Sequence, residues 1–127
     1  MKPIAIILAV VMLIGLVPIS EVDSSSIVSK GMASWYSEED PGVLETTANM
    51  EQFDDTRLTC AVWQIPFDTI LKVTNLENGK SVYVRVNDRG PAKRLVKKGR
   101  IIDLTKTAFS KISDLKKGLI RVKVEII

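Results

Sequence analysis

The segment VTNLENGKSVYVRVNDRGP, residues 73–91, contains two runs in which apolar and polar residues alternate. Between the runs stands Asn78-Gly79, and an Asn-Gly pair in that position is the strongest short-range signal of a β-hairpin. Successive side chains of a strand point to opposite faces, so one face of the second strand would carry Val82, Val84 and Val86. The segment therefore predicts an antiparallel pair of strands with one apolar face.

The second strand of this hairpin stops at Asp88, Arg89, Gly90 and Pro91. A Gly-Pro pair is typical of a tight turn, which would hold a carboxylate and a guanidinium side by side at the strand end. Two interpretations of this pair are open: a structural ion pair at a turn, and a charged pair with a function. The local sequence does not decide between them.

Further strand signals lie on both sides of the hairpin. Alternating apolar runs predict strands at residues 31–37, 66–76 and 119–127, whereas residues 57–63 fit either a helix or a strand. Short strands at this spacing are typical of a barrel or a sandwich. On the last strand, one face would carry Ile120, Val122, Val124 and Ile126.

The segments between these strands are predicted to be loops, apart from one or two short helices. DLTKTAFSKI, residues 103–112, predicts a short helix with Thr105 as its N-cap, and Gly118 ends the turn that follows. The acidic segment at residues 38–55 and the basic segment PAKRLVKKGR, residues 91–100, are predicted to be loops. The sequence thus predicts a mainly β domain.

The composition excludes several kinds of active site. The chain of 127 residues suits one domain, and its formal net charge of +3 suits an acidic polymer as partner. It contains no His, which excludes Ser-His-Asp triads, Cys-His dyads and nearly all zinc sites. The single Cys60 has no partner for an intramolecular disulfide, and we expect it to be a buried thiol.

Residues 1–24 have the pattern of a secretory signal peptide. Lys2 precedes an apolar run that ends before Pro18, and this run is shorter than the roughly 20 residues that cross a bilayer. We expect cleavage near Ser24, with a retained membrane anchor as the alternative, and a domain of residues 25–127 outside the cytoplasm. No Cys follows the apolar run, so we do not expect a lipoprotein.

Four stretches stand in the order and spacing of the RlpA (rare lipoprotein A) family: GMASWYS at residues 31–37, TTANMEQFD at 46–54, the long run at 58–91, and GRIIDLTKTAF at 99–109. The chain resembles this family over nearly all of residues 31–124, and residues 73–91 are the most specific part. The resemblance implies a six-stranded double-psi β-barrel, related to the barrel domain of expansins, with a groove across one face.

The resemblance also implies an activity, that of an endolytic lytic transglycosylase. Such a lyase cleaves the glycan strands of peptidoglycan, prefers strands without stem peptides, and leaves 1,6-anhydro-muramic acid ends. We accordingly expect a role in cell-wall remodelling in the periplasm or cell envelope, with peptidoglycan as the partner and no nucleic acid. A membrane contact is expected only through an uncleaved N-terminal segment. We expect a monomer that needs no metal and no organic cofactor.

Three acids of this sequence match acids of the family's motifs, and the resemblance implies that they are catalytic: Asp88, Glu51 and Asp54. Asp88 is the first candidate for the acid/base, because the end of a buried strand is partly desolvated and such a carboxyl group is suited to proton transfer. Another acid, Asp103, is expected to be structural, near the start of the predicted helix.

Substrate contacts are expected from three further residues. Arg89 would bind a carboxylate of the substrate or orient one of the protein. The rings of Trp35 and Tyr36 would stack on sugar rings, although Trp35 suits the core equally well.

The sequence departs from the family at two positions. Met50 replaces the usual Gly before the motif's Glu, and Val62 stands where active members have His. A valine side chain forms no hydrogen bond and carries no charge. The alternative function is therefore a non-catalytic, expansin-like module that binds or loosens cell-wall polysaccharide.

Overall fold

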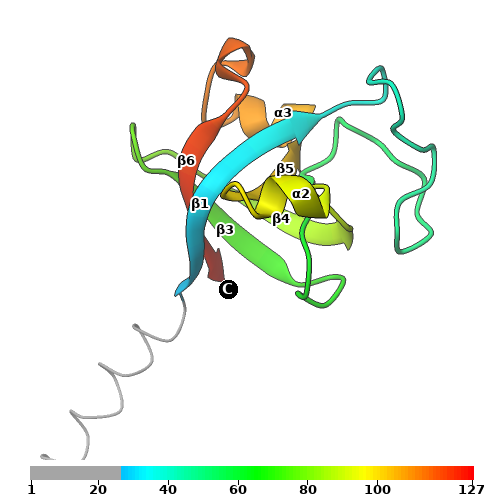
Figure 1. Cartoon of the computed structure of the whole chain (residues 1–127), viewed down its shortest axis with the longest axis horizontal. Coiled ribbons are helices and arrows are strands. Elements are labelled where there is room, and N and C mark those ends of the chain that lie inside the picture. Colours follow the sequence, from blue (N-terminus) through cyan, green and yellow to red (C-terminus); the bar gives the residue numbers. More distant parts are fainter. Residues whose placement is uncertain (1–26) are drawn as a thin grey trace, which may run out of the picture.

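The computed structural model describes residues 27–127, and six strands of this part of the chain close into a barrel (Figure 1). The strands are β1 (Ile27–Tyr36), β2 (Thr59–Ala61), β3 (Ile70–Asn75), β4 (Ser81–Asp88), β5 (Arg100–Thr105) and β6 (Ile120–Ile126). Two short helices, α2 (Lys93–Val96) and α3 (Lys106–Ser110), and the 3-10 turn η1 (Leu115–Lys117) lie in the connections. The mainly β, six-stranded barrel expected from the sequence is confirmed.

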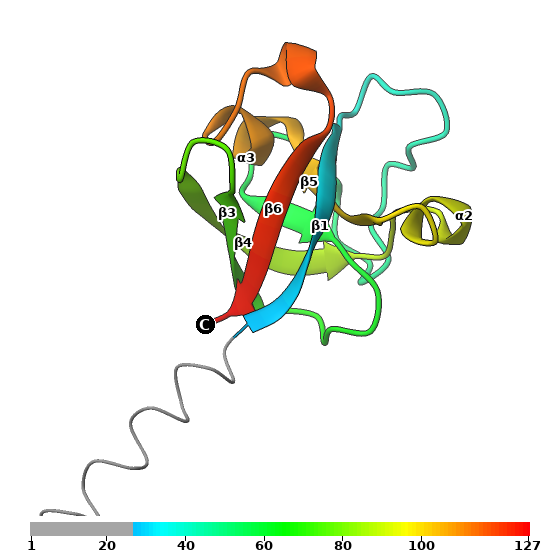
Figure 2. The ribbon, with the colours of Figure 1, turned by 60° about the vertical axis from the view of Figure 1, so that its left-hand side comes forward.

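The order around the barrel is β1-β5-β2-β4-β3-β6. β6 returns to pair with β1, and these two strands lie side by side in Figure 2. Two pairs are parallel, β1 with β5 and β2 with β4, and the other pairs are antiparallel. The short β2 thus lies between β4 and β5. Its Ala61 pairs with Asp88 on one side and with Asp103 on the other, so two acidic residues from different strands flank one residue.

The core forms from the apolar faces of these strands and from α3. Alternate residues of β3, β4 and β6 point inward, and Phe109 and Ile112 add their fully buried side chains. Cys60 is also fully buried, as expected, and burial raises the pKa of its thiol above the usual value. Within residues 27–127, no helix has the length and apolar character needed to cross a membrane.

The hairpin predicted at residues 73–91 is confirmed. β3 and β4 pair antiparallel with Val73 opposite Val82, and Gly79 has a φ of 76° in the turn between them. The left-handed region is open to Gly because it lacks a Cβ. The N-cap prediction is confirmed as well, because the Thr105 hydroxyl accepts a hydrogen bond from the Ala108 amide at 3.3 Å.

Two details of the predicted elements are wrong. The basic segment 91–100 contains the helical turn α2, built from residues with good helix propensity. Residues 100–105 form β5, which carries two charged residues and pairs with remote strands, so its local pattern is weak. Ile126 alternates with the buried residues of β6, as expected, but at the end of the strand it is 43% exposed. The expected signal peptide, with its boundary at Ser24, lies outside the described residues.

Candidate active site

Asp88 lies where three parts of the fold meet. It is the last residue of β4, and its Oδ1 accepts hydrogen bonds from the backbone amides of Ala48 and Arg89, both at 2.9 Å. Its Oδ2 accepts a hydrogen bond from the hydroxyl of Tyr36, at the end of β1, at 3.2 Å. The carboxylate is therefore held by a strand, by its own exit turn and by the loop at residues 37–58.

Tyr36 is fixed on its other side by an aromatic contact. Its ring stacks on Phe53 with 4.7 Å between the ring centroids and an interplanar angle of 17°. Burial, followed by the charge of Asp88, raises the pKa of Tyr36 above its usual value, so its hydroxyl keeps its proton and remains a donor. The structure thus places Tyr36 beside Asp88, with one ring face covered by protein.

Asp103 is a second carboxylate next to Ala61, and the sequence interpretation as a purely structural residue did not anticipate this position. Its Oδ1 accepts hydrogen bonds from the Ser34 hydroxyl and from the Arg100 guanidinium, the latter at 3.3 Å. A Cβ built on Gly90 would lie 3.5 Å from Asp103 Oδ2, so the exit turn packs against this carboxylate. The signal that could have found this position is the alternation in residues 100–105. If these residues form a strand, Asp103 lies on the face opposite to its two buried neighbours.

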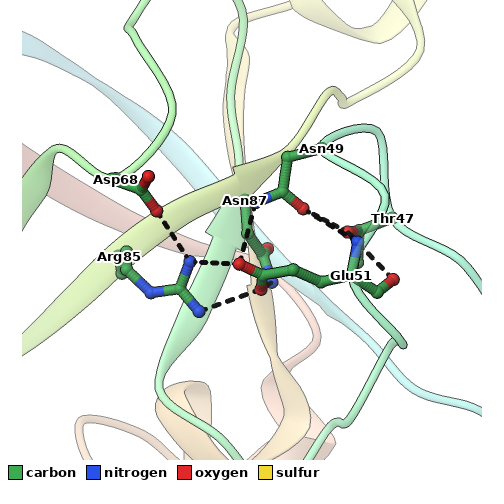
Figure 3. Close-up of polar contacts among 6 residues, drawn as sticks. All are labelled: Thr47, Asn49, Glu51, Asp68, Arg85 and Asn87. Carbon is green, nitrogen blue, oxygen red and sulfur yellow. Dashed lines mark hydrogen bonds and ion pairs between the residues drawn. The ribbon is translucent and has the colours of Figure 1, made fainter.

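Glu51 is part of a hydrogen-bonded cluster on the outer face of β4 (Figure 3). Arg85 binds it through two nitrogens, Nη1 to Oε2 at 2.7 Å and Nη2 to Oε1 at 2.9 Å. The side-chain amides of Asn49 and Asn87 also donate to its oxygens, at 2.9 and 3.1 Å. The bonds from Arg85 first, and those from the asparagines with them, lower the pKa of Glu51 to about 2.

Asp54 serves as the cap of a local turn. Its Oδ1 accepts hydrogen bonds from the Thr56 amide at 3.0 Å and the Thr56 hydroxyl at 2.6 Å, and these bonds lower its pKa. Glu51 and Asp54 both line a polar cavity of about 510 Å³. The structure thus brings these two acids together, while Asp88 turns toward Tyr36 and Ala48.

Arg89 anchors a loop of the protein. Its Nη1 donates to the carbonyl oxygens of Val62 and Ile65, at 3.0 and 2.8 Å, and its guanidinium carbon lies 3.9 Å from the ring centroid of Phe67. In the part of the chain that the structure describes, no ion pair joins Arg89 to Asp88. The structural ion pair considered from the sequence is therefore not formed.

Trp35 and Val62 are two further residues that the sequence singles out. Trp35 donates from Nε1 to the Leu115 carbonyl at 3.1 Å and packs partly buried against the core. Val62 is 8% exposed, and its amide donates to the Asp88 carbonyl at 3.2 Å. An apolar side chain thus stands directly beside the end of β4.

One group of acids has oxygens close enough to one another to face a common cation. A carboxylate oxygen from each of Glu38, Asp54 and Asp55 lies within 4.8 Å of the others. Both aspartates already accept hydrogen bonds from the protein, Asp54 from Thr56 and Asp55 from the Glu38 amide. Exposed acidic groups of this kind do not by themselves define a metal site.

The sequence matches the family model described as lytic transglycolase over residues 28–124. It is 46% identical over 98 residues to the endolytic peptidoglycan transglycosylase RlpA of Campylobacter jejuni subsp. jejuni, covering 76% of this chain and 33% of that protein. The protein of the same name from Vibrio cholerae is 44% identical over 97 residues, covering 76% and 35%. The chain thus matches about a third of the length of these curated relatives.

Solved structures share the fold at lower sequence identity. A Streptomyces papain inhibitor superposes with a TM-score of 0.61 at 20% identity, covering 80% of this chain and 96% of that one. The apo expansin of Clavibacter michiganensis superposes with a TM-score of 0.59 at 21% identity, covering 78% and 50%. At these identities the likeness concerns the fold alone.

Proposed function

The chain belongs to the lytic transglycolase family, and from that premise we propose that its barrel is an endolytic peptidoglycan lytic transglycosylase. The enzyme cuts glycan strands, preferring those without stem peptides, and leaves 1,6-anhydro-muramic acid ends. The curated relatives that carry this activity in their names share with the chain the stretch that forms the barrel. This shared stretch supports placing the groups that the proposed reaction needs in the barrel.

The observation that carries this proposal is the position of Asp88, which Tyr36, Ala48 and Arg89 hold at the end of β4. Cleavage of a glycosidic bond requires a proton for the leaving oxygen. Protonated Asp88 gives that proton as the C1–O bond breaks. The C6 hydroxyl of the same sugar then attacks C1 and returns its proton to Asp88, so the carboxyl group ends the cycle in its starting form.

Asp103 is the second group in this mechanism. The transition state has oxocarbenium character, and a nearby negative charge stabilises it. Asp103 lies across Ala61 from Asp88, and its Oδ1 is oriented by Ser34 and Arg100. We assign it the stabilising charge, and assign sugar contacts to Trp35 and to the exposed part of Tyr36.

The test is digestion of purified peptidoglycan, with and without stem peptides, by the full chain. Mass spectrometry shows which chemical group ends each fragment and therefore which reaction has cut the strand. We expect anhydro-ended fragments, released faster from strands without stem peptides. Fragments with reducing ends would instead establish a hydrolase.

One observation favours a second candidate function, a non-catalytic module that binds wall polysaccharide. The position at which active family members have His carries the buried Val62 here. Such a module would be retained on insoluble glycan and would release no fragments. The same digestion experiment therefore separates the two candidates.

We also propose that the protein works outside the cytoplasm, because its proposed substrate is the cell wall. Residues 1–24 would act as the signal peptide and residues 25–127 would form the mature, monomeric domain. The N-terminal sequence of protein recovered from the cell envelope tests this proposal. A mature chain beginning near Ser24 is expected, whereas an intact Met1 would indicate a retained anchor.

A further inference from the structure

The hydrogen bond from the Ala48 amide to Asp88 depends on a long loop. Residues 37–58 connect β1 to β2, and they contain no helix and a single bridge, between Thr46 and Gln52. A loop of this kind takes its position from the side chains that anchor it. Next to Ala48, the Asn49 amide donates to the Asn87 carbonyl of β4 at 3.3 Å. A side-chain anchor adjoins this bond and helps to decide where the N–H of Ala48 points.

Glu51 is that anchor. Its backbone carbonyl accepts from the Thr47 amide at 2.8 Å, and Asn49 donates to its side chain, which closes residues 47–51 into a compact turn. Its carboxylate is bound by Arg85 and Asn87, two residues of β4. The turn is thus fastened to the strand that ends in Asp88.

The same contacts leave Glu51 poorly suited to proton transfer. Both carboxylate oxygens accept two hydrogen bonds each, from Arg85 and the two asparagines (Figure 3). A general acid must hold a proton at the working pH and present it to the leaving oxygen. With a pKa of about 2, Glu51 is ionised at neutral pH.

We propose that Glu51 is a positioning residue, whose ion pair with Arg85 fixes the turn at residues 47–51 so that the Ala48 amide remains on Asp88. The inference rests on the proposed function, because it takes Asp88 as the acid/base. It assigns Glu51 a role different from that of Asp88. The catalytic role expected for Glu51 from the family motif is replaced by an electrostatic one.

The first test is Glu51→Gln, which keeps an oxygen that accepts from Arg85 but removes the carboxylic acid. Loss of a general acid costs roughly 100- to 10,000-fold in rate. For a positioning residue we expect kcat to fall about 10-fold with KM nearly unchanged, since one charged hydrogen-bonded contact is weakened. A loss of about 100-fold or more would overturn the proposal.

The second test exchanges the charges of the ion pair. Because Asp68 also binds Arg85, at 2.9 Å, all variants carry Asp68→Asn, which serves as the matched control. Glu51→Arg and Arg85→Glu are each expected to lower kcat by more than 10-fold, through repulsion between like charges, and the double variant should recover most of the loss. No recovery in a double variant that melts like the control would contradict the positioning role.

A third measurement does not depend on activity. Hydrogen exchange of the Ala48 amide, followed by NMR in the full chain, should become faster in Glu51→Gln and return to the control rate in the charge-exchanged pair. An unchanged Ala48 exchange rate would overturn the inference. If the wild type releases no glycan fragments, the proposed function fails, while this measurement still decides whether Glu51 positions the loop.

Discussion

Tyr36 and Asp88 form the contact that most directly links the end of β1 to the proposed acid/base. The phenol keeps its proton because burial raises its pKa, so its hydroxyl remains a hydrogen-bond donor to Asp88. Phe53 holds the ring from the other side. The orientation of one carboxylate oxygen therefore depends on a single hydroxyl group.

Replacing Tyr36 with Phe removes that hydroxyl and keeps the ring on Phe53. This hydrogen bond strengthens as Asp88 loses its proton in the reaction, because a bond to a charged group contributes about 1.5–3 kcal/mol and a bond to a neutral group about 0.5–1.5 kcal/mol. We therefore expect glycan cleavage to slow about 10-fold. The melting temperature should change little. Tyr83→Phe is the matched control, because Tyr83 is 54% exposed on the same barrel. Equal rates for the two variants would show that the hydroxyl does not matter.

The ion pair of Glu51 predicts how stability depends on pH. Its pKa is lowered from 4.5 to about 2 in the folded protein, so its contribution is complete above about pH 4.5 and is lost as the pH falls toward 2. Glu51 is 38% exposed, so solvent screens the pair and limits its contribution to less than about 1 kcal/mol.

Thermal unfolding of the wild type and of Glu51→Gln between pH 7 and pH 2 measures this contribution. The difference in melting temperature should be constant down to about pH 5 and should shrink toward zero at pH 2. The other acids titrate in both proteins and cancel in the comparison. A difference that does not depend on pH would contradict the electrostatic role of Glu51.

Most residues around the site could be predicted from the sequence, but the different roles of the acidic residues could not. Asp88, Glu51 and Asp54 all stand in the family's motifs, but only the three-dimensional contacts distinguish an acid beside Tyr36 from acids bound by Arg85 and Thr56. The catalytic roles expected for Asp88 and Asp54 therefore remain predictions, and for Glu51 we have proposed a positioning role instead. Asp103 was assigned differently because its neighbours across β1 and β2 are remote in sequence.

The N-cap of α3 joins this short helix to the rest of the fold. The Thr105 hydroxyl accepts from the Ala108 amide and donates to the Arg57 carbonyl at 2.6 Å. Thr105 is fully buried at the end of β5. One side chain thus ties a strand, a helix and the loop before β2 together.

Thr105→Ala removes both contacts. Losing an N-cap costs about 0.5–2 kcal/mol, and the Arg57 carbonyl loses a hydrogen-bond partner as well, so we expect a loss of about 2 kcal/mol. Chemical denaturation measures it, with Thr107→Ala on the same helix as control. A loss no greater than that of the control would show that the cap is dispensable.

Local sequence signals were sufficient to predict a strand where that strand pairs with the next strand along the chain. The hairpin of β3 and β4 needs only its alternation and the Asn78-Gly79 turn. β5 had no such signal, because it pairs with β1 and β2 across long stretches of chain. The single turn of α2 could not be predicted, because the basic residues in and around it also suit a loop.

The whole barrel explains why the proposed site lies around β2. The strand is only three residues long, and the closed order places it between β4 and β5. Asp88 and Asp103 therefore flank Ala61 although 14 residues and a helical turn separate them in the sequence. The family resemblance implies the barrel, but the position of these two acids on either side of Ala61 follows from its register.

The central claim is that Asp88 transfers the proton in glycan cleavage. The direct test compares wild type and Asp88→Asn in the digestion of peptidoglycan without stem peptides, counting 1,6-anhydro ends by mass spectrometry. Asn keeps the shape of the side chain and cannot donate the proton, so the account predicts anhydro ends from the wild type and none above background from a variant that still melts cooperatively. Anhydro ends released by Asp88→Asn at the wild-type rate would contradict it.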